Sequence, residues 1–254
     1  MRSIAITGAN GQIGQSFLAS TALFPELNVK FFDKNDLDVT NPKSIREALR
    51  LEHIDYLINC AAYTNVVQAE NDSEAAHLLN GIAVGNLAEA AQRHRTHLIQ
   101  ISTDYVFDGL KSGPYLPSDP TNPINEYGKS KLLGEQLAAE RCERHSIIRT
   151  SWVYSEFGSN FFTKIKARAD QGETLWITED YIGCPTYAPD LATYILTGIS
   201  KDKLSLGVSH FAGKEVMTWY QLAKKLLPKA DIRVASPQLE SAGIQRPKNS
   251  VLAS

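Results

Sequence analysis

A tyrosine and a lysine lie four residues apart in the string Tyr127-Gly128-Lys129-Ser130-Lys131. If this segment is helical, the two side chains share one face. A free phenol, with a pKa of about 10, is a poor acid–base catalyst at neutral pH, and we expect the ammonium of Lys131 to lower the pKa of Tyr127. The pair can then give a proton to a carbonyl oxygen as hydride arrives. An exposed helical pair is the alternative, but the position after a strand and a proline-rich loop favours catalysis.

A predicted strand ends in two hydroxyl-bearing residues, Ser102 and Thr103. In doubly wound sheets, ligands gather at the carboxyl ends of the strands. A hydroxyl there can hydrogen-bond the same carbonyl oxygen as Tyr127, and we choose Thr103 for this role. The next two residues, Asp104 and Tyr105, are candidates for contacts with substrate hydroxyls, with core packing as the alternative for Tyr105.

Glycines recur at a G-x-x-G-x-x-G spacing in the string Thr7-Gly8-Ala9-Asn10-Gly11-Gln12-Ile13-Gly14. One glycine permits a positive φ at the turn, another lets the backbone approach a pyrophosphate, and the third lets the helix pack on the sheet. The helix N-terminus then offers free N–H groups to phosphates. A strand before the turn and a helix after it are the context that this motif requires. The string therefore predicts a dinucleotide site.

An acidic residue, Asp33, ends the second predicted strand, 19 residues after the last of these glycines. At this distance an acidic side chain accepts hydrogen bonds from the adenosine ribose. We favour that role over a solvated strand end. Asp38 and Val39 follow and either border the adenine or, for Asp38, form a turn. Lys34 is adjacent to Asp33, and for this reason we expect both NADPH and NADH to serve as cofactor.

Short apolar runs alternate with helical patterns in the first half of the chain, which predicts βαβ units and a parallel sheet. The fold class expected is therefore α/β, a doubly wound parallel sheet of the Rossmann type with a small C-terminal substrate-binding lobe. The predicted strands are Ser3–Thr7, Val29–Phe32, Tyr56–Cys60, Leu98–Ser102 and Ser146–Thr150. The predicted helices between them are Ser44–Arg50, Leu78–Ala91 and Glu126–Glu143. In the second helix, Gly81 and Gly85 are expected to allow close packing against the sheet.

Four prolines make the segment Lys111–Asn125 a loop. We expect a dinucleotide-binding domain over residues 1–150 and the substrate lobe over residues 151–254. The lobe is predicted to hold a strand at Leu175–Thr178 and helices at Asn160–Asp170 and Thr218–Leu227. A strand near Val208–Phe211 could return to the main sheet.

The composition is that of an ordinary globular protein, with 254 residues, 43% hydrophobic and 21% charged. A formal net charge of -2 gives no reason to expect a nucleic acid or a membrane as partner. Three widely separated cysteines argue against a disulfide framework and a zinc site, so we expect reduced thiols and a cytoplasmic protein. No stretch is typical of a signal peptide or a membrane span.

The chain resembles the extended short-chain dehydrogenase/reductase family, and within it the reductases of dTDP-linked 4-keto sugars, along nearly its whole length. The strings that carry the resemblance, besides the glycine-rich turn, are Asp38-Val39-Thr40-Asn41, Asn59-Cys60-Ala61-Ala62-Tyr63-Thr64, Ser102 to Gly109, Asn125 to Lys131 with Gly134-Glu135, Arg149 to Tyr154, Gly158 to Phe161, Gly183-Cys184-Pro185-Thr186 and Arg246 to Ser250.

This resemblance implies reduction of the 4-keto group of dTDP-4-dehydro-β-L-rhamnose by NADPH or NADH, with the nucleotide sugar as the partner molecule. It implies a catalytic set of Thr103, Tyr127 and Lys131. The implied cofactor contacts are Gly8, Asn10, Gly11, Gln12, Ile13, Gly14, Asp33, Asp38, Val39, Ala61, Ala62, Tyr63, Ser102, Tyr127 and Lys131. The implied substrate contacts are Thr103, Asp104, Tyr105, Trp152 and Asn160.

Trp152 lies just past a predicted strand end, where core packing and a substrate contact compete. The carboxyl end of a parallel strand faces the ligand crevice. An indole can cover the apolar face of a deoxysugar while its N–H bonds a hydroxyl. We therefore favour the substrate contact.

The chain departs from the family at two places. Some members carry a glutamate that helps to bind Mg²⁺ at a dimer interface, but Ser16 stands at that position, so we predict no metal. The chain ends at Ser254, where relatives usually continue, which indicates either a shortened form or an incomplete sequence. A homodimer is possible. The alternatives in function are a reductase or epimerase of another nucleotide sugar, or a non-catalytic dinucleotide-binding subunit like the regulatory β subunit of methionine adenosyltransferase.

Overall fold

A central parallel sheet organises the computed structural model, which describes residues 1–50, 53–235 and 244–253. In these residues six strands pair in the order β10-β5-β4-β3-β1-β2, every neighbouring pair parallel. The strands are β1 (Arg2–Thr7), β2 (Leu27–Phe32), β3 (Tyr56–Asn59), β4 (His97–Thr103), β5 (His145–Thr150) and β10 (Gly207–His210). The strand order reverses between β1 and β3, so ligands are expected at the carboxyl ends of these two strands.

Alternating side chains of the strands serve two separate cores, because successive residues of a strand point to opposite faces. Ala5, Leu57, Leu98 and Ile147 pack into one cluster. Their neighbours in sequence pack into the other, among them Ile4, Ile6, Ile58, Ile99 and Ile148. Both faces of the sheet are thus buried under helices, which explains why these strands are continuously apolar in sequence.

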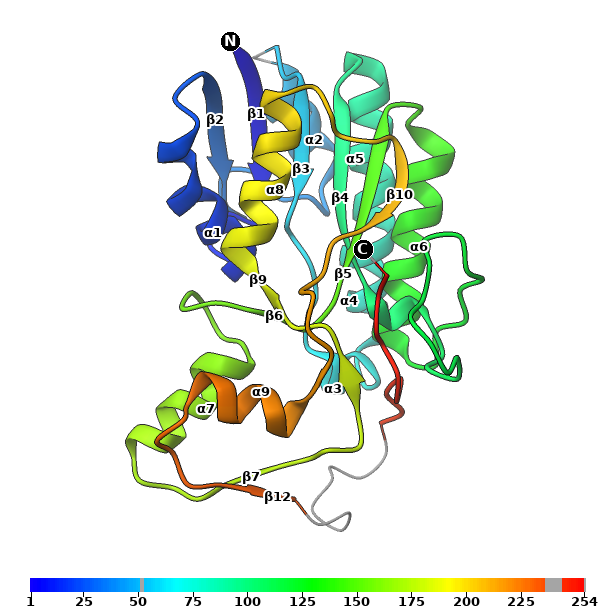
Figure 1. The fold of residues 1–254 in the computed structure, drawn as a ribbon. Helices are drawn as coiled ribbons and strands as arrows, with labels where there is room; N and C mark the ends of the chain where they lie inside the picture. Colours follow the sequence, from blue (N-terminus) through cyan, green and yellow to red (C-terminus); the bar gives the residue numbers. More distant parts are fainter. Residues whose placement is uncertain (51–52, 236–243, 254) are drawn as a thin grey trace.

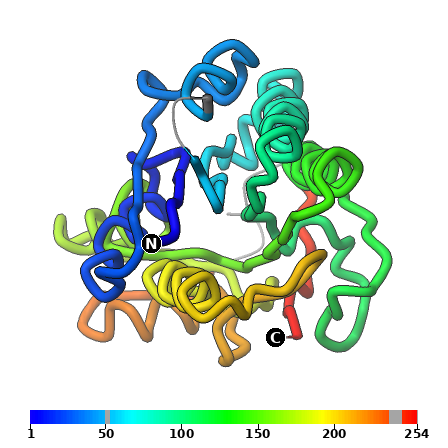
Figure 2. The backbone as a smooth tube through the Cα atoms, turned by 90° about the horizontal axis from the view of Figure 1, so that it is seen from above, coloured from blue at the N-terminus to red at the C-terminus, as the bar shows by residue number. Residues whose placement is uncertain are grey.

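Helices cover the two faces of the sheet, as the view from above shows (Figure 2). On one side lie α1 (Gln12–Ser20) and α8 (Ala188–Ser200), and on the other lie α2 (Pro42–Arg50), α5 (Ala83–His94) and α6 (Glu126–Arg141). Two short helices, α3 (Val66–Ala69) and α4 (Ser73–His77), lead into a π-helical turn, η2 (Leu78–Ile82), that continues as α5. Two 3-10 turns, η1 (Thr21–Leu23) and η3 (Asp104–Val106), follow α1 and β4. This arrangement confirms the doubly wound α/β fold.

The small residues of the η2–α5 segment pack against a helix. A Cβ built on Gly81 would lie 2.5 Å from the Leu133 side chain, and one on Gly85 would lie 3.1 Å from Leu137. Both leucines belong to α6. The expected close packing of these glycines therefore occurs, but against α6 rather than against the sheet.

The lobe lies below the sheet in Figure 1, beyond the carboxyl ends of its strands. Its elements are β6 (Val153–Tyr154), α7 (Phe161–Asp170), β7 (Leu175–Ile177), β8 (Ile182–Gly183), β9 (Thr186–Tyr187), β11 (Met217–Thr218), α9 (Trp219–Leu226) and β12 (Ile232–Val234). They form three two-stranded ribbons, β6 with β9, β8 with β11 and β7 with β12. A small core that includes Ile165, Leu175, Ala223 and Ile232 holds α7 and α9 against the β7–β12 ribbon.

The chain crosses between sheet and lobe several times after residue 150. It leaves β5 for the lobe, returns through α8 and β10, and enters the lobe again through β11 and α9. The strand β10 pairs with β5, so the segment near Val208 does rejoin the main sheet. The last described residues run back along the molecule, where Leu252 bridges to Tyr115 and Asn249 to Ile182. The lobe is therefore assembled from segments that are separated in sequence.

The predicted elements agree with the observed ones to within a few residues. The proline-rich segment 111–125 holds no helix or strand longer than a single bridge. The helix expected from Asn160 begins one residue later, because Asn160 is its N-cap. Among the described residues, no helix combines the length and the apolar character needed to cross a bilayer.

Candidate active site

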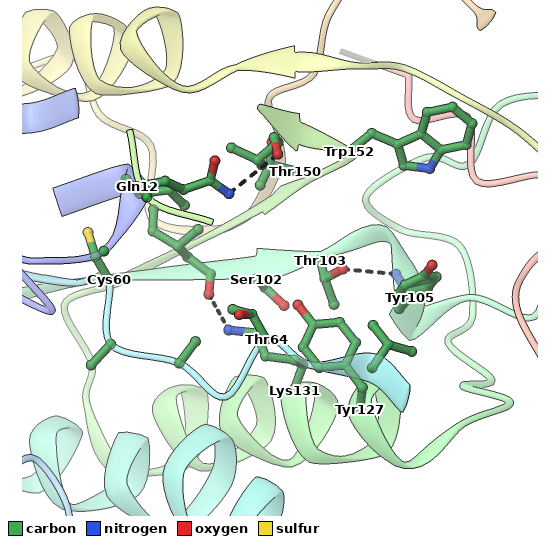
Figure 3. A pocket seen from close by; sticks show the side chains of 18 of the residues that line it. Gln12, Cys60, Thr64, Ser102, Thr103, Tyr105, Tyr127, Lys131, Thr150 and Trp152 are labelled. Carbon is green, nitrogen blue, oxygen red and sulfur yellow. Dashed lines mark hydrogen bonds between the residues drawn. The ribbon is translucent and has the colours of Figure 1, made fainter. Parts of the chain in front are cut away.

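A cavity of about 390 Å³ opens where the carboxyl ends of the central strands meet the lobe (Figure 3). Its wall combines the turn after β1, the ends of β3, β4 and β5, helix α6, and aromatic side chains of the lobe. The residues that line it are Asn10, Gly11, Gln12, Ile13, Asn59, Cys60, Ala61, Ala62, Thr64, Val66, Ile101, Ser102, Thr103, Asp104, Tyr105, Tyr127, Lys131, Thr150, Trp152, Val153, Gly158, Ser159 and Trp219.

The glycine-rich turn forms one end of this cavity. Gly8 has a φ of +67°, and a Cβ built there would lie 2.6 Å from the amide nitrogen of Ala61. A Cβ on Gly14 would lie 2.4 Å from the Gly8 carbonyl oxygen. The two glycines thus let the turn close tightly between β1 and the end of β3. No side chain caps the first turn of α1, whose N-cap is Gly11, so its backbone N–H groups remain available for an anion at the cavity.

A chain of buried hydrogen bonds fixes the floor of the cavity. Thr7 donates to Asn59 Oδ1 at 2.6 Å, and Asn59 Nδ2 donates to Gln100 Oε1 at 2.8 Å. Gln100 Nε2 and Lys131 Nζ then both donate to the carbonyl oxygen of Ile101, at 2.8 and 2.7 Å. The chain joins the ends of β1, β3 and β4 to helix α6 and holds the lysine against the strand.

Tyr127 and Lys131 come from the first two turns of α6, which begins after the N-cap Asn125. The Asn125 side chain accepts a hydrogen bond from the Gly128 amide at 2.8 Å. A Cβ on Gly128 would lie 2.2 Å from the Tyr105 carbonyl oxygen, so this glycine lets the helix start pack directly on the turn after β4. Tyr127 is therefore held facing Thr103, while the Lys131 side chain turns to the Ile101 carbonyl oxygen, as the close-up shows (Figure 3).

The pKa of Tyr127 does not follow the sequence expectation. Burial raises the pKa of the phenol to about 12, and the carboxylate of Asp104 adds to this, while a hydrogen bond with Thr103 acts in the opposite direction. The Lys131 ammonium is directed to the Ile101 carbonyl oxygen. The expected lowering of the Tyr127 pKa was wrong for this structure, because burial of the phenol sets the direction of the shift and the Lys131 ammonium points to the strand rather than to the phenol.

Lys131 itself is only 4% exposed. Burial lowers the pKa of its ammonium to about 8, and the nearby Glu135 carboxylate opposes this. The pKa of the neighbouring Cys60 thiol is raised by burial. A buried lysine with a pKa near neutrality changes its charge readily, and such shifted groups cluster at functional sites.

Asp104 carries a buried carboxyl group at the same end of β4. It is 3% exposed, and its oxygens accept hydrogen bonds from Thr103 and Ser151, each at 3.0 Å. Burial raises the pKa of Asp104 to about 6, although hydrogen bonds from Ser250, Ser151 and Thr103 lower it. The side chains that hydrogen-bond to this carboxyl group are therefore neutral hydroxyls.

Trp152 forms the lobe side of the cavity. Its ring stacks on Trp219 with centroids 3.7 Å apart and an angle of 6° between the planes. A Cβ on Gly183 would meet the indole at 2.5 Å, so only a glycine fits under the ring. The backbone of Trp152 has a φ of 49°, which is uncommon for a bulky side chain and costs energy. Such strain is typical of positions where a side chain is held for function.

Several residues expected at the cofactor lie outside the lining of this cavity. Asp33 accepts hydrogen bonds from the amides of Asn35 and Asp36 and from the Asn10 side chain. Asp38 accepts from the amide and the hydroxyl of Thr40, which is a turn role. The remaining ones are Gly8 and Gly14 within the turn, the buried Val39, and Tyr63 at the rim.

Asn160 lies outside the cavity lining and has a structural role. Its side-chain oxygen accepts from the Thr163 amide, and its Nδ2 donates to the carbonyl oxygens of Ser155 and Phe157, both at 2.9 Å. Thr163 completes a capping box for α7. Because these contacts use the donors and acceptors of the amide, the geometry gives no support to a substrate contact by Asn160.

Sequence reasoning missed Asn80, which holds the backbone between the lining residues Ala62 and Thr64. It lies in the π-helical turn η2, where such turns often mark functional sites. Its amide group bonds both the N–H and the carbonyl oxygen of Tyr63, at 2.8 and 2.9 Å, and its Nδ2 also donates to Ser130 on α6. No sequence signal distinguished this asparagine from the small residues around it.

Thr150 was also missed. Its hydroxyl oxygen is buried at the cavity and has no hydrogen-bond partner in the part of the chain that the structure describes. A buried hydroxyl normally has a partner. The unpaired oxygen, the uncapped helix start and the tight glycine turn together fit a polar ligand such as a dinucleotide.

The fold and the cavity define a class of protein, a nicotinamide-dinucleotide oxidoreductase of the extended short-chain dehydrogenase/reductase type. The chain belongs to the family described as the RmlD substrate binding domain, whose model matches residues 1–254. It is 36% identical over 245 residues to a dTDP-4-dehydrorhamnose reductase of Aggregatibacter actinomycetemcomitans, covering 95% of this chain and 82% of that protein.

Two further relatives bear on cofactor and substrate. The structure of a dTDP-4-dehydrorhamnose reductase from Bacillus anthracis in complex with NADP matches with a TM-score of 0.93 and 35% identity, covering 100% of this chain and 91% of that chain. A probable dTDP-4,6-dihydroxy-2-methyloxan-3-one 4-ketoreductase of Streptomyces antibioticus is 36% identical, covering 89% of this chain and 76% of that protein. The family that the sequence resembles is thereby confirmed.

Proposed function

We propose that this protein reduces the 4-keto group of dTDP-4-dehydro-β-L-rhamnose to the alcohol, with NADPH or NADH as the source of hydride. The observation that carries the proposal is one cavity that joins Thr103, Tyr127 and Lys131 to the glycine-rich turn. Relatives named for this reaction, one of them in complex with NADP, support it.

The chain's own residues can supply the proton chemistry of such a reduction. The bound nicotinamide cofactor would supply the hydride to the carbonyl carbon. Because the pKa of Tyr127 is about 12, the phenol stays protonated at neutral pH and can give its proton to the carbonyl oxygen. The Thr103 hydroxyl would stabilise the phenolate that remains by donating to it, and the Lys131 ammonium one helical turn away would add a positive charge. Water can then reprotonate Tyr127 for the next turnover.

The cofactor would lie along the turn after β1 and the end of β3. The backbone N–H groups of Gln12 and Ile13 at the α1 N-terminus suit a pyrophosphate. The residues Ala61 and Ala62 border the cavity without bulky side chains, which leaves room for a ribose and a nicotinamide ring. Asp33 would approach the adenosine ribose from the edge of the sheet.

The substrate would enter from the lobe side. The stacked rings of Trp152 and Trp219 offer an apolar wall to the face of a deoxysugar. Asp104 and Tyr105, both on the cavity wall, offer polar atoms to sugar hydroxyls. We infer a cytoplasmic location for the reaction, because the three cysteines are free thiols, as expected in a reducing compartment.

The test is turnover of reduced nicotinamide with a panel of nucleotide sugars. NADPH is mixed with the protein and either dTDP-4-dehydro-β-L-rhamnose or another dTDP-linked 4-keto-6-deoxysugar, and the absorbance of the reduced cofactor is followed. Faster turnover with the second sugar would indicate a 4-ketoreductase of another dTDP-linked sugar, the kind of activity for which the Streptomyces antibioticus relative is named. Interconversion of sugars without loss of added NADPH would indicate an epimerase. Tight NADPH binding without any turnover would indicate a non-catalytic subunit.

A further inference from the structure

A buried ion pair lies directly behind the catalytic residues. Glu135, 4% exposed, and Arg149, also 4% exposed, form a two-armed contact in which Arg149 Nε and Nη2 donate to the Glu135 carboxylate at 2.9 and 2.7 Å. Arg149 is anchored in turn by the Pro117 carbonyl oxygen at 3.3 Å and by the Phe107 ring at 5.1 Å. Such a pair costs much desolvation energy and is weak evidence for stability by itself. The position of this ion pair next to the catalytic residues therefore indicates a role other than stabilising the fold.

Glu135 lies next to both elements that carry the catalytic residues, helix α6 and the end of β4. It follows Lys131 by four residues on α6, so both side chains lie on the same face of the helix. Its carboxylate also accepts a hydrogen bond from Ser102 at 2.5 Å, next to Thr103 at the end of β4. One carboxylate thus links the strand end that carries Thr103 to the helix that carries Lys131.

Lys131 needs a nearby negative charge to remain an ammonium. Its Nζ donates to the neutral Ile101 carbonyl oxygen, and an isolated buried ammonium tends to lose its proton. The titratable groups that bear on it directly are Glu135 on α6 and the Cys60 thiol at the end of β3. Tyr127 on α6 and Asp104 after β4 line the same cavity, and Arg149 on β5 lies behind Glu135. Of these groups, Glu135 is an acid placed on the same helix face, and its carboxylate is paired with a guanidinium.

We propose that Glu135 is a positioning residue that keeps Lys131 in its ammonium form and locks the Ser102–Thr103 strand end against α6, with Arg149 holding the carboxylate in place. The importance of this positioning for catalysis rests on the proposed reduction. The charge of Lys131 can be measured without turnover, so the two proposals fail separately.

The experiment follows the titration of Lys131 by nuclear magnetic resonance of protein labelled with ¹³C,¹⁵N-lysine. The Lys131 signals are assigned by their loss in Lys131→Met. In Glu135→Gln we expect the midpoint of Lys131 to fall by about one pH unit, because the carboxylate that favours the ammonium is removed. The alkaline limb of kcat/KM should move down by the same amount. Glu140→Gln, which removes an exposed acid from the same helix, is the control and should leave the midpoint in place.

Glu135→Gln leaves the Arg149 guanidinium buried without its partner and can fail to fold. The double variant Glu135→Gln/Arg149→Met removes both charges together and is expected to fold. Because loss of the Arg149 charge acts in the opposite direction from behind Glu135, the double variant should lower the midpoint of Lys131 by less than Glu135→Gln does. A merely structural role would reduce thermal stability and leave this midpoint unchanged, and that result in folded Glu135→Gln, or in the double variant where only the latter folds, would overturn the proposal. A shifted midpoint in a protein that turns over no sugar would reject the proposed function alone.

Discussion

The Thr103 hydroxyl donates a hydrogen bond to the Asp104 carboxylate, with 3.0 Å between the two oxygens. The same hydroxyl oxygen accepts from the Tyr105 amide at 3.2 Å and is hydrogen-bonded to the Tyr127 phenol. A hydroxyl has one proton, so Thr103 can accept from the protonated phenol while it donates to Asp104, and it must turn this proton away from Asp104 to stabilise the phenolate. Asp104 therefore competes with the Tyr127 phenolate for the proton of the Thr103 hydroxyl.

Replacing Asp104 by asparagine should stabilise the protein at neutral pH and above. Because the folded-state pKa of about 6 is above the ordinary value of 3.8, folding favours the protonated acid. That stabilising contribution is fully present below about pH 4 and is lost as the pH rises through 6. Since one pKa unit corresponds to about 1.4 kcal/mol, the expected gain of Asp104→Asn over the wild type approaches about 3 kcal/mol above pH 7. Urea unfolding of both proteins between pH 4 and 8 measures the difference, and a difference that does not change with pH would contradict this assignment.

Tyr127→Phe should lower kcat/KM for the keto sugar by about 10²–10⁴ and leave the affinity for NADPH almost unchanged. The substitution removes the proton donor but keeps the ring, which meets Tyr105 edge-on with centroids 5.6 Å apart. Stopped-flow turnover and NADPH titration give the two quantities. Tyr154→Phe, a tyrosine outside the cavity, serves as the control. Retention of most activity in Tyr127→Phe would mean that another group gives the proton.

Asp33→Ala should shift cofactor preference toward NADPH, because the carboxylate repels a 2′-phosphate and favours a free 2′-hydroxyl. The alanine also removes the hydrogen bonds to the amides of Asn35 and Asp36, so the turn can loosen. Asp33→Asn separates these effects, since it keeps an acceptor and removes the charge. The ratio of kcat/KM for NADPH and NADH is the measurement. If both variants lose NADPH activity more than NADH activity, Asp33 does not face the ribose.

Trp152→Ala should raise KM for the sugar nucleotide and destabilise the protein only moderately. A fully buried tryptophan costs about 3–5 kcal/mol when truncated to alanine, and we expect a smaller loss for this partly buried ring. Thermal unfolding and steady-state kinetics are compared with Trp176→Ala, which changes a ring that is 48% exposed on β7. A large loss of stability with unaltered kinetics would make Trp152 a core residue.

Thr150→Val should weaken ligand binding without harming the free protein. Valine has the same shape and removes a buried hydroxyl that has no partner in the described residues, so stability should stay equal or rise, by up to about 1 kcal/mol. The dissociation constant of NADPH and KM of the sugar show which ligand uses the hydroxyl. The matched variant Thr7→Val breaks the bond to Asn59 and should lose stability. Unchanged binding of both ligands by the Thr150→Val variant would mean that the Thr150 hydroxyl has no role in recognition.

Much of the fold could be predicted from local patterns. The alternation of Ile4, Ala5 and Ile6 between two cores is a property of consecutive residues, and the glycine spacing after them already indicates a tight turn. The Tyr127–Lys131 pair was found because its two members share one helix. These features depend on residues that are near one another in sequence.

The remaining features of the site depend on contacts that no local pattern reports. The sign of the pKa shift of Tyr127 follows from burial, which only the packed structure reveals. Glu135 and Arg149 meet across α6 and β5, and neither has a sequence neighbour that indicates the other. Asn160 is different, because an asparagine three residues before Thr163 at a helix start is a capping signal that outweighs its presence in a family motif.

The stacked indoles of Trp152 and Trp219 give the protein an internal optical reporter. The sequence holds three tryptophans, and two of them border the cavity with their rings 3.7 Å apart. Reduced nicotinamide absorbs in the region where indoles emit, so its arrival beside this pair transfers excitation energy away from it. The third ring, Trp176, lies on β7 with its side chain half in water and emits at longer wavelength. Quenching that is strongest in the short-wavelength part of the emission would thus report occupation of the cavity, whereas loss of the lobe's structure would shift the whole spectrum to longer wavelength.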